Sequence, residues 1–159
     1  MRKYVNSEAV QHNMKLMQMG ADVHQINSKM CYVSFELEDV KVAYVYNINS
    51  KGKYFLERIK PYPLPIKAFD KEDDIIKIIR IDIEQFNNAK KSKNIDDFIE
   101  INSTLNKTIK KFEDLFLYYN VPGFDVRQMK EAIEVIDNSI EEIKSKSERI
   151  YFKKEPDNL

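Results

Sequence analysis

The side chains best suited to nucleophilic catalysis or metal binding are His12, His24 and the single cysteine, Cys31. The two histidines form no HxxxH or HExxH pattern with each other, and no second cysteine is present, so no zinc site is predicted. Cys31 falls at an inward position of a predicted strand, where no histidine or basic residue is fixed beside it to activate a thiolate. We therefore predict no nucleophile and no metal ligand among these three residues.

The carboxylates are numerous, but their spacing is typical of helix starts and helix surfaces and not of a catalytic site. The pairs Asp73-Asp74 and Asp96-Asp97 stand at predicted helix starts, where negative charge favours the helix dipole. Asp82 and Glu84 are two residues apart within one helix and therefore point in different directions. Metal-dependent hydrolysis needs carboxylates that converge from different elements, which this spacing does not specify. No catalytic residues are predicted.

Phosphate binding and redox chemistry are equally unsupported by the sequence. The glycines stand only at positions 20, 52 and 123, and neither a Walker pattern nor GxGxxG occurs. The 26 basic and 26 acidic residues balance, which removes the simple electrostatic case for nucleic-acid binding. We predict that the chain is not an enzyme and uses no cofactor.

The class of protein follows from composition. The chain of 159 residues is 43% hydrophobic and 33% charged, which is typical of a folded globular protein. One cysteine leaves no intrachain disulfide and fits a reducing compartment. No signal peptide and no apolar run near the roughly 20 residues of a membrane span are found. The abundance of Lys, Ile, Asn and Tyr is typical of low-GC bacteria and their phages. We expect the bacterial cytoplasm and no membrane.

The order of elements predicts an α+β fold: an N-terminal helix and a three-stranded antiparallel meander, followed by a helical hairpin or three-helix bundle. Four segments are expected: a helix-plus-meander module, a proline-rich linker, a helical module and a frayed tail, at residues 1–60, 61–69, 70–152 and 153–159. The first helix is predicted over residues 7–19, with Ser7 as N-cap, Gly20 after its end and Met14 and Met17 packed against the sheet.

The turns of the meander set its register. Asn49-Ser50-Lys51-Gly52 predicts a turn that pairs Ile48 with Tyr54, and a turn at Glu38-Asp39 pairs Phe35 with Val42. Alternation then separates two faces. The core face is predicted to hold Cys31, Val33, Phe35, Leu37, Val40, Val42, Tyr44, Tyr46, Ile48, Tyr54 and Leu56.

The opposite face of the meander is less polar than a solvated sheet surface. Tyr32, Val45, Phe55 and Ile59 fall on it, so it is predicted to be a contact patch. The alternative is that the helical half folds over this face. Acidic residues at the start of the next helix are predicted to extend the binding surface. The predicted partner-binding residues are Tyr32, Val45, Phe55, Ile59, Asp70, Glu72, Asp73 and Asp74.

The helical half carries two matched apolar stripes on either side of a turn at Asn120-Val121-Pro122-Gly123. This arrangement predicts an antiparallel hairpin over residues 94–150 whose stripes bury each other. Asn94 and Asp125 are predicted to begin its two helices. The stripes are Phe98, Ile101, Leu105, Phe112, Phe116 and Tyr119, then Met129, Ile133, Ile136, Ile140 and Ile143.

A nucleic-acid-binding regulator is the runner-up function. Helix, three-stranded meander and helix is the element order of the double-stranded RNA-binding domain, whose second helix offers basic residues to phosphates. Here that position reads Asp70-Lys71-Glu72-Asp73-Asp74, which would repel them. Nucleic acid is therefore not favoured. The phosphate contacts under this alternative would be Lys51, Lys53, Arg58, Lys60 and Lys67.

A meander such as Met30-Cys-Tyr-Val-Ser-Phe-Glu-Leu37 beside helices, with Pro61-Tyr-Pro-Leu-Pro65, resembles the general make-up of phage-encoded anti-CRISPR proteins. That group shares no signature residues to carry over. The resemblance implies non-enzymatic inhibition of a type II RNA-guided DNA nuclease by occlusion. Three alternative functions are therefore predicted: a partner-blocking inhibitor, a nucleic-acid-binding regulator, and a scaffold that forms homo-oligomers through its hairpin.

Overall fold

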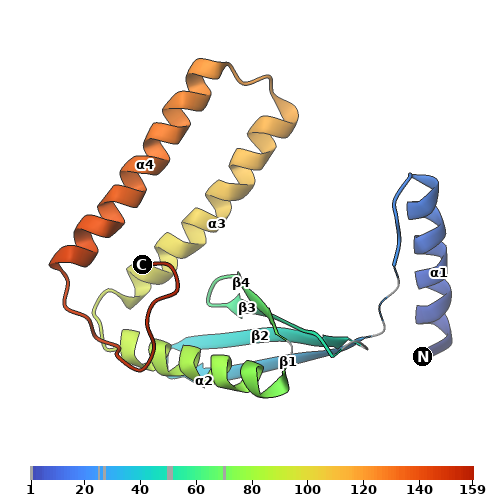
Figure 1. Cartoon of the computed structure of the whole chain (residues 1–159), viewed down its shortest axis with the longest axis horizontal. Coiled ribbons are helices and arrows are strands. Elements are labelled where there is room, and N and C mark those ends of the chain that lie inside the picture. The colour runs from blue at the N-terminus through green and yellow to red at the C-terminus, as the bar shows by residue number, and fades with distance from the viewer. Residues whose placement is uncertain (1, 25, 27, 50–51, 70) are drawn as a thin grey trace.

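The computed structural model of the chain describes every residue except 1, 25, 27, 50, 51 and 70. It confirms an α+β fold in which a helix and an antiparallel meander precede three further helices (Figure 1). The elements are α1 (Arg2–Gln18), β1 (Ser28–Leu37), β2 (Val40–Asn49), β3 (Tyr54–Lys60), β4 (Leu64–Phe69), α2 (Glu72–Ala89), α3 (Ile95–Tyr118) and α4 (Gly123–Lys146).

The predicted register of the first three strands is confirmed. Phe35 pairs with Val42 in the β1–β2 ladder, and Ile48 pairs with Tyr54 in the β2–β3 ladder. Glu38 takes a left-handed φ of 54° at the β1–β2 turn. Residues 50 and 51 of the second turn lie outside the described residues, but Gly52 after them has φ 70°, which glycine adopts without a steric penalty. The strands lie in the order β1-β2-β3-β4.

The expectation of a plain linker at residues 61–69 is wrong, because β4 (Leu64–Phe69) pairs antiparallel with β3. Proline lacks a backbone donor and is tolerated only at strand ends, bulges and edge strands. β4 is an edge strand, and Pro65 stands opposite Glu57 beside a shift in register. The meander therefore has four strands, and the chain passes from β4 to α2 without an extended hinge.

One face of the sheet and α2 make the core. The inward residues of β2 and β3 meet the stripe of α2, and Val42, Tyr44 and Ile75 are almost fully buried. This confirms the predicted core face for the central strands, while Phe35 on edge strand β1 remains at the margin. The buried cluster consists of Val40, Val42, Tyr44, Leu56, Tyr62, Ile75, Ile79 and Phe86.

Helix α1 differs from its prediction in two ways. It begins at Arg2, so Ser7 lies inside the helix and is not its N-cap. Met14 and Met17 are more than half exposed and do not fill gaps against the sheet. The end of the helix is as expected: Gly20 has φ 91°, and the backbone N–H of Ala21 donates to the Leu16 carbonyl at 3.0 Å, which closes a glycine C-cap.

Helices α3 and α4 form the predicted antiparallel hairpin, joined at Tyr119 to Pro122. Asn94 is the N-cap of α3 as expected, whereas Pro122 takes that position in α4 and leaves Asp125 in the first turn. The expectation that the two stripes bury each other is wrong. No residue of α3 or α4 is buried, and every residue from Lys130 to Lys146 is exposed.

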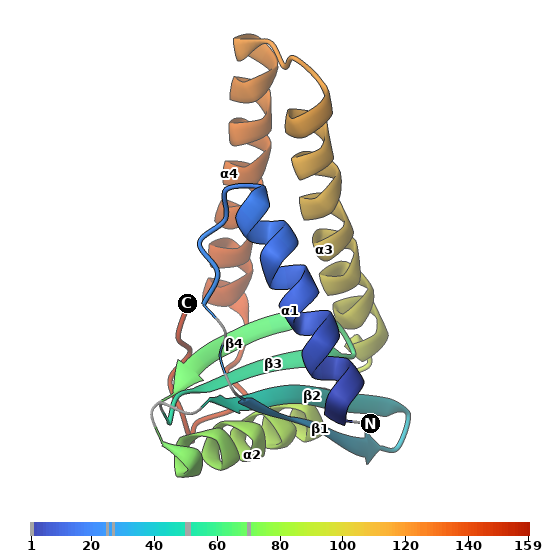
Figure 2. The same cartoon turned by 90° about the vertical axis from the view of Figure 1, so that its right-hand side faces the viewer.

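The helical half leaves most of the second face of the sheet uncovered, although Ala43 on that face is fully buried. Figure 1 shows α2 along one face, while the hairpin and α1 rise from opposite ends of the sheet on the other side. Figure 2 confirms that the strands lie between α2 and these upright helices. The tail, which we expected to fray, returns to α2: Lys153 Nζ donates to Glu84 Oε2 at 2.7 Å, and Asn88 Nδ2 to the Ile150 carbonyl at 2.7 Å.

Candidate protein-binding site

The open face of the sheet, which points away from α2, carries the predicted contact patch. Tyr32 and Val45 are direct cross-strand neighbours, and Phe55 stands opposite Asn47 on the adjoining strand pair. Tyr32 is 57% exposed and Phe55 is 50% exposed, whereas Val45 is half-buried between them. The alternation of the strands therefore brings these three apolar side chains to one surface, as predicted.

Ile59 is less closely tied to that group. It lies on the same face of β3 as Phe55, but Glu57 stands between them on that face, and the register shifts at Ala43 and Tyr44 opposite Ile59. Ile59 is half-buried. It marks one end of the open face rather than its centre.

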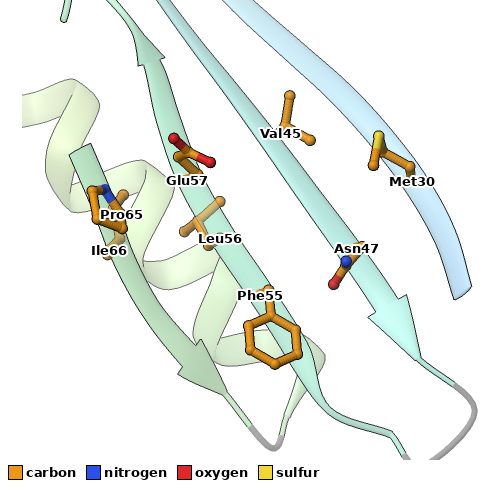
Figure 3. A pocket seen from close by; sticks show the side chains of 8 residues that line it. All are labelled: Met30, Val45, Asn47, Phe55, Leu56, Glu57, Pro65 and Ile66. Atoms are coloured by element: carbon orange, nitrogen blue, oxygen red, sulfur yellow. The ribbon is translucent and has the colours of Figure 1, made fainter. Parts of the chain in front are cut away.

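A hollow of about 430 Å³ lies on the open face between β1 and β4 (Figure 3). Val45 and Phe55 form part of its wall, and Met30, which is 74% exposed, stands at its β1 side. Met30 pairs with Asn47 and falls on the same face of β1 as Tyr32, although it is not among the predicted binding residues. Pro65 and Ile66 were missed because β4 was expected to be a linker. The lining consists of Met30, Val45, Asn47, Phe55, Leu56, Glu57, Pro65 and Ile66.

The hollow has few polar groups, and one of them lacks a partner. Within the described part of the chain, the side-chain oxygen of Asn47 is buried and accepts no hydrogen bond. A buried carbonyl oxygen without a donor costs free energy, so a donor brought by a bound molecule would be favourable here. Glu57 is exposed at the opposite wall and supplies negative charge (Figure 3). The site is an apolar surface with one acceptor and one carboxylate.

The acidic start of the next helix does not join this surface. Glu72 begins α2, which runs along the opposite face of the sheet, with Asp73 and Asp74 in the same turn (Figure 1). Asp70 lies outside the described residues. The predicted binding residues therefore fall into two groups on opposite faces, and two members of the sheet group, Val45 and Phe55, line the hollow.

The most closely packed ionisable groups belong to the core. Arg58 Nη1 donates to Asp82 Oδ1 at 2.7 Å and to Oδ2 at 2.8 Å, and the Tyr44 hydroxyl donates to Asp82 Oδ2 at 2.6 Å. Arg58 is only 4% exposed, and its guanidinium lies over the rings of Tyr62 and Phe86 at 4.6 and 4.9 Å. Burial, followed by the hydrogen bond to Asp82, raises the pKa of Tyr44 far above its ordinary value.

This cluster fastens α2 to the sheet. It joins one residue each from β2, β3 and α2, and its charges compensate each other inside the core. The finding also corrects one assignment of the nucleic-acid alternative, because Arg58 faces Asp82 in the interior and cannot contact a phosphate outside. Lys51 of that set lies outside the described residues.

The residues first considered for chemistry are dispersed. His24 Nε2 lies 3.2 Å from Asp22 Oδ2 on an exposed loop, Cys31 is half-buried on β1, and His12 is exposed on α1. Among the described residues no three side chains of His, Cys, Asp or Glu are grouped closely enough to hold a metal ion. None of the helices in the described part combines the length and apolar character that a membrane span requires.

Comparison of the chain with protein-family models, with curated proteins and with solved structures found no match.

Proposed function

We propose that this protein binds another protein through the open face of its sheet and acts by occupying that partner, without catalysis of its own. The observation that carries the proposal is the exposed apolar hollow around Val45 and Phe55 on a well-packed sheet. Exposed aromatic residues around a concave apolar surface are the usual anchors of protein interfaces.

The scaffold beneath the hollow is rigid, which favours recognition. The other side of β2 and β3 is buried against α2 and held by the Arg58–Asp82 ion pair. A surface supported in this way loses little conformational entropy on binding. The upright hairpin and α1 flank the open face (Figure 2), so a partner would enter between two helical arms. A helix or loop with apolar side chains and a donor for the Asn47 oxygen fits this description.

The narrower form of the proposal names the partner class. The resemblance to anti-CRISPR proteins implies a type II RNA-guided DNA nuclease of a bacterial host, inhibited by blocking a domain movement or the DNA channel. The balanced charge of the chain disfavours mimicry of DNA and favours occlusion of a protein surface.

Replacing both Tyr32 and Phe55 with alanine tests the proposal. Truncation of one interface aromatic typically costs about 2 kcal/mol or more of binding, so the double variant should lose partner capture from a lysate of the source cells almost completely. Its melting temperature should remain near that of the parent, because both rings are half-exposed.

The hairpin supplies a matched control. Tyr118 and Phe124 are also strongly exposed and belong to the ends of α3 and α4 that meet at the hairpin turn, which Figure 1 shows away from the sheet, so their replacement with alanine should leave capture unchanged. Equal capture by the two double variants would contradict the proposal. The narrower form is tested separately by adding the protein to a purified type II nuclease: DNA cleavage at the uninhibited rate would refute that partner class alone.

A further inference from the structure

We propose that the α3–α4 hairpin is a dimerisation element: α4 packs antiparallel against α4 of a second copy, and the two hairpins form a four-helix bundle. This proposal is independent of the binding role of the sheet. Two observations support it. An apolar seam on α4 is exposed in the monomer, and the charged residues beside that seam are complementary to those of a second, antiparallel α4.

The seam lies on α4. Six of its apolar residues follow one another at alternating intervals of three and four residues, the spacing by which coiled-coil helices keep one face toward a partner. We call this face the α4 seam. It consists of Val126, Met129, Ile133, Ile136, Ile140 and Ile143. From Val126 to Ile143 the seam extends along about 26 Å of α4.

The monomer does not use this seam. Ile136 is 49% exposed and Ile140 is 45% exposed, and no residue of α4 is buried. Among the hydrogen bonds, ion pairs and ring contacts of the described residues, none joins α3 to α4. The ring contact between Phe112 and Phe116 lies within α3. Figures 1 and 2 show both helices extending away from the sheet with free flanks. The ring of Phe98 already packs against Tyr62 and Phe86, but the rest of the α3 stripe, from Ile101 onward, is available to complete the same bundle.

The charges beside the seam specify an antiparallel second copy. Seven-residue spacing places Asp125 and Lys146 on one flank of the seam, and Lys130 and Asp137 on the other. In an antiparallel pair like flanks meet. When Ile133 of one copy packs beside Ile136 of the other, Asp125 faces Lys146 and Lys130 faces Asp137.

The two-fold axis of the dimer relates the two copies, so each of these two charge pairs occurs twice, as a symmetric dimer requires. A parallel pair would join unlike flanks and keep only Asp125 against Lys130. All four charged side chains are exposed in the monomer. Lys146 lies beside Glu142 on the exposed surface, and such a pair is weak enough to be exchanged.

Charge exchange on these exposed positions tests both the dimer and its orientation in the full chain. The wild-type mass by sedimentation equilibrium should rise from monomer to dimer between low micromolar and submillimolar concentration. Asp125→Lys should weaken the dimer about tenfold, because it places lysine against Lys146 twice. Adding Lys146→Asp should restore the affinity.

Three results would overturn the proposal. A monomeric mass at every concentration would exclude the dimer. Failure of Lys146→Asp to rescue Asp125→Lys would exclude the antiparallel orientation. Strong destabilisation of a monomer by Ile136→Asp would show that the seam is already buried within the hairpin. The Tyr32 and Phe55 variant should dimerise as the parent does, so failure of the sheet-face proposal remains distinguishable.

Discussion

Two regions of the molecule carry equally regular apolar patterns: the sheet with α2, and the α3–α4 hairpin. The patterned residues are buried in the first region and exposed in the second. In the first region the patterned residues meet inside one chain: Ile75 is 1% exposed, and Val42 and Tyr44 are fully buried. In the second, the isoleucines of α4 remain about half-exposed. The amphipathic pattern thus predicts which residues share a face, and the tertiary arrangement decides whether that face finds a partner within the chain.

This difference suggests that the sheet and α2 provide the stability of the fold, whereas the hairpin serves interaction with other molecules. The sheet and α2 share a core that is tied by a buried ion pair and extended by Ile95, Phe98 and Ile99 at the start of α3. The hairpin, like the open face of the sheet, offers apolar surface that water covers in the monomer. Surfaces of this kind are expected to act in association.

The largest effect is expected from Asp82→Ala. It would leave the buried Arg58 guanidinium without a counter-charge and the Tyr44 hydroxyl without its acceptor, a loss of about 3–5 kcal/mol in the free energy of unfolding. Urea denaturation measures it. Glu84→Ala, on the same helix, removes an exposed contact with Lys153 and should leave unfolding nearly unchanged. Similar losses in the free energy of unfolding of the two variants would show that the buried ion pair contributes no more to stability than the exposed one.

The next effect compares one substitution in the two regions. Ile75→Ala should cost about 2–5 kcal/mol, because it opens a cavity between α2 and the sheet. Ile140→Ala should cost less than about 1 kcal/mol at concentrations where the protein is monomeric, because the side chain is already half in water. A loss at Ile140 as large as that at Ile75 would show that the hairpin is packed in the monomer.

Much of the fold could be predicted because local signals agreed. Turn residues and alternation set the strand register, and the pairing of Ile48 with Tyr54 is as expected. β4 was missed because Pro63 and Pro65 disfavour a strand in general, whereas an edge strand tolerates them. The start of α1 was placed too late because Ser7 is a good N-cap by type, although the helix already begins at Arg2.

The candidate site could be predicted only in part. Alternation placed Tyr32, Val45 and Phe55 on the face opposite the core, but it left open whether the helical half would fold over that face. The hollow also depends on Pro65 and Ile66, which reach it only because β4 joins the sheet. The pairing of Arg58 with Asp82 could not be anticipated either, since it joins residues 24 apart in the chain whose spacing fits no motif.

Amide hydrogen exchange at two protein concentrations tests the central contrast most directly, because it reports both regions in the same sample. We expect strong protection of β2 amides that is independent of concentration, because the core around β2 is complete within one chain. We expect weak protection of α4 amides in dilute solution and strong protection in concentrated solution, as the seam is covered by a second copy. Equally strong protection of α4 at both concentrations would show that the seam is covered within the monomer and not by a second copy.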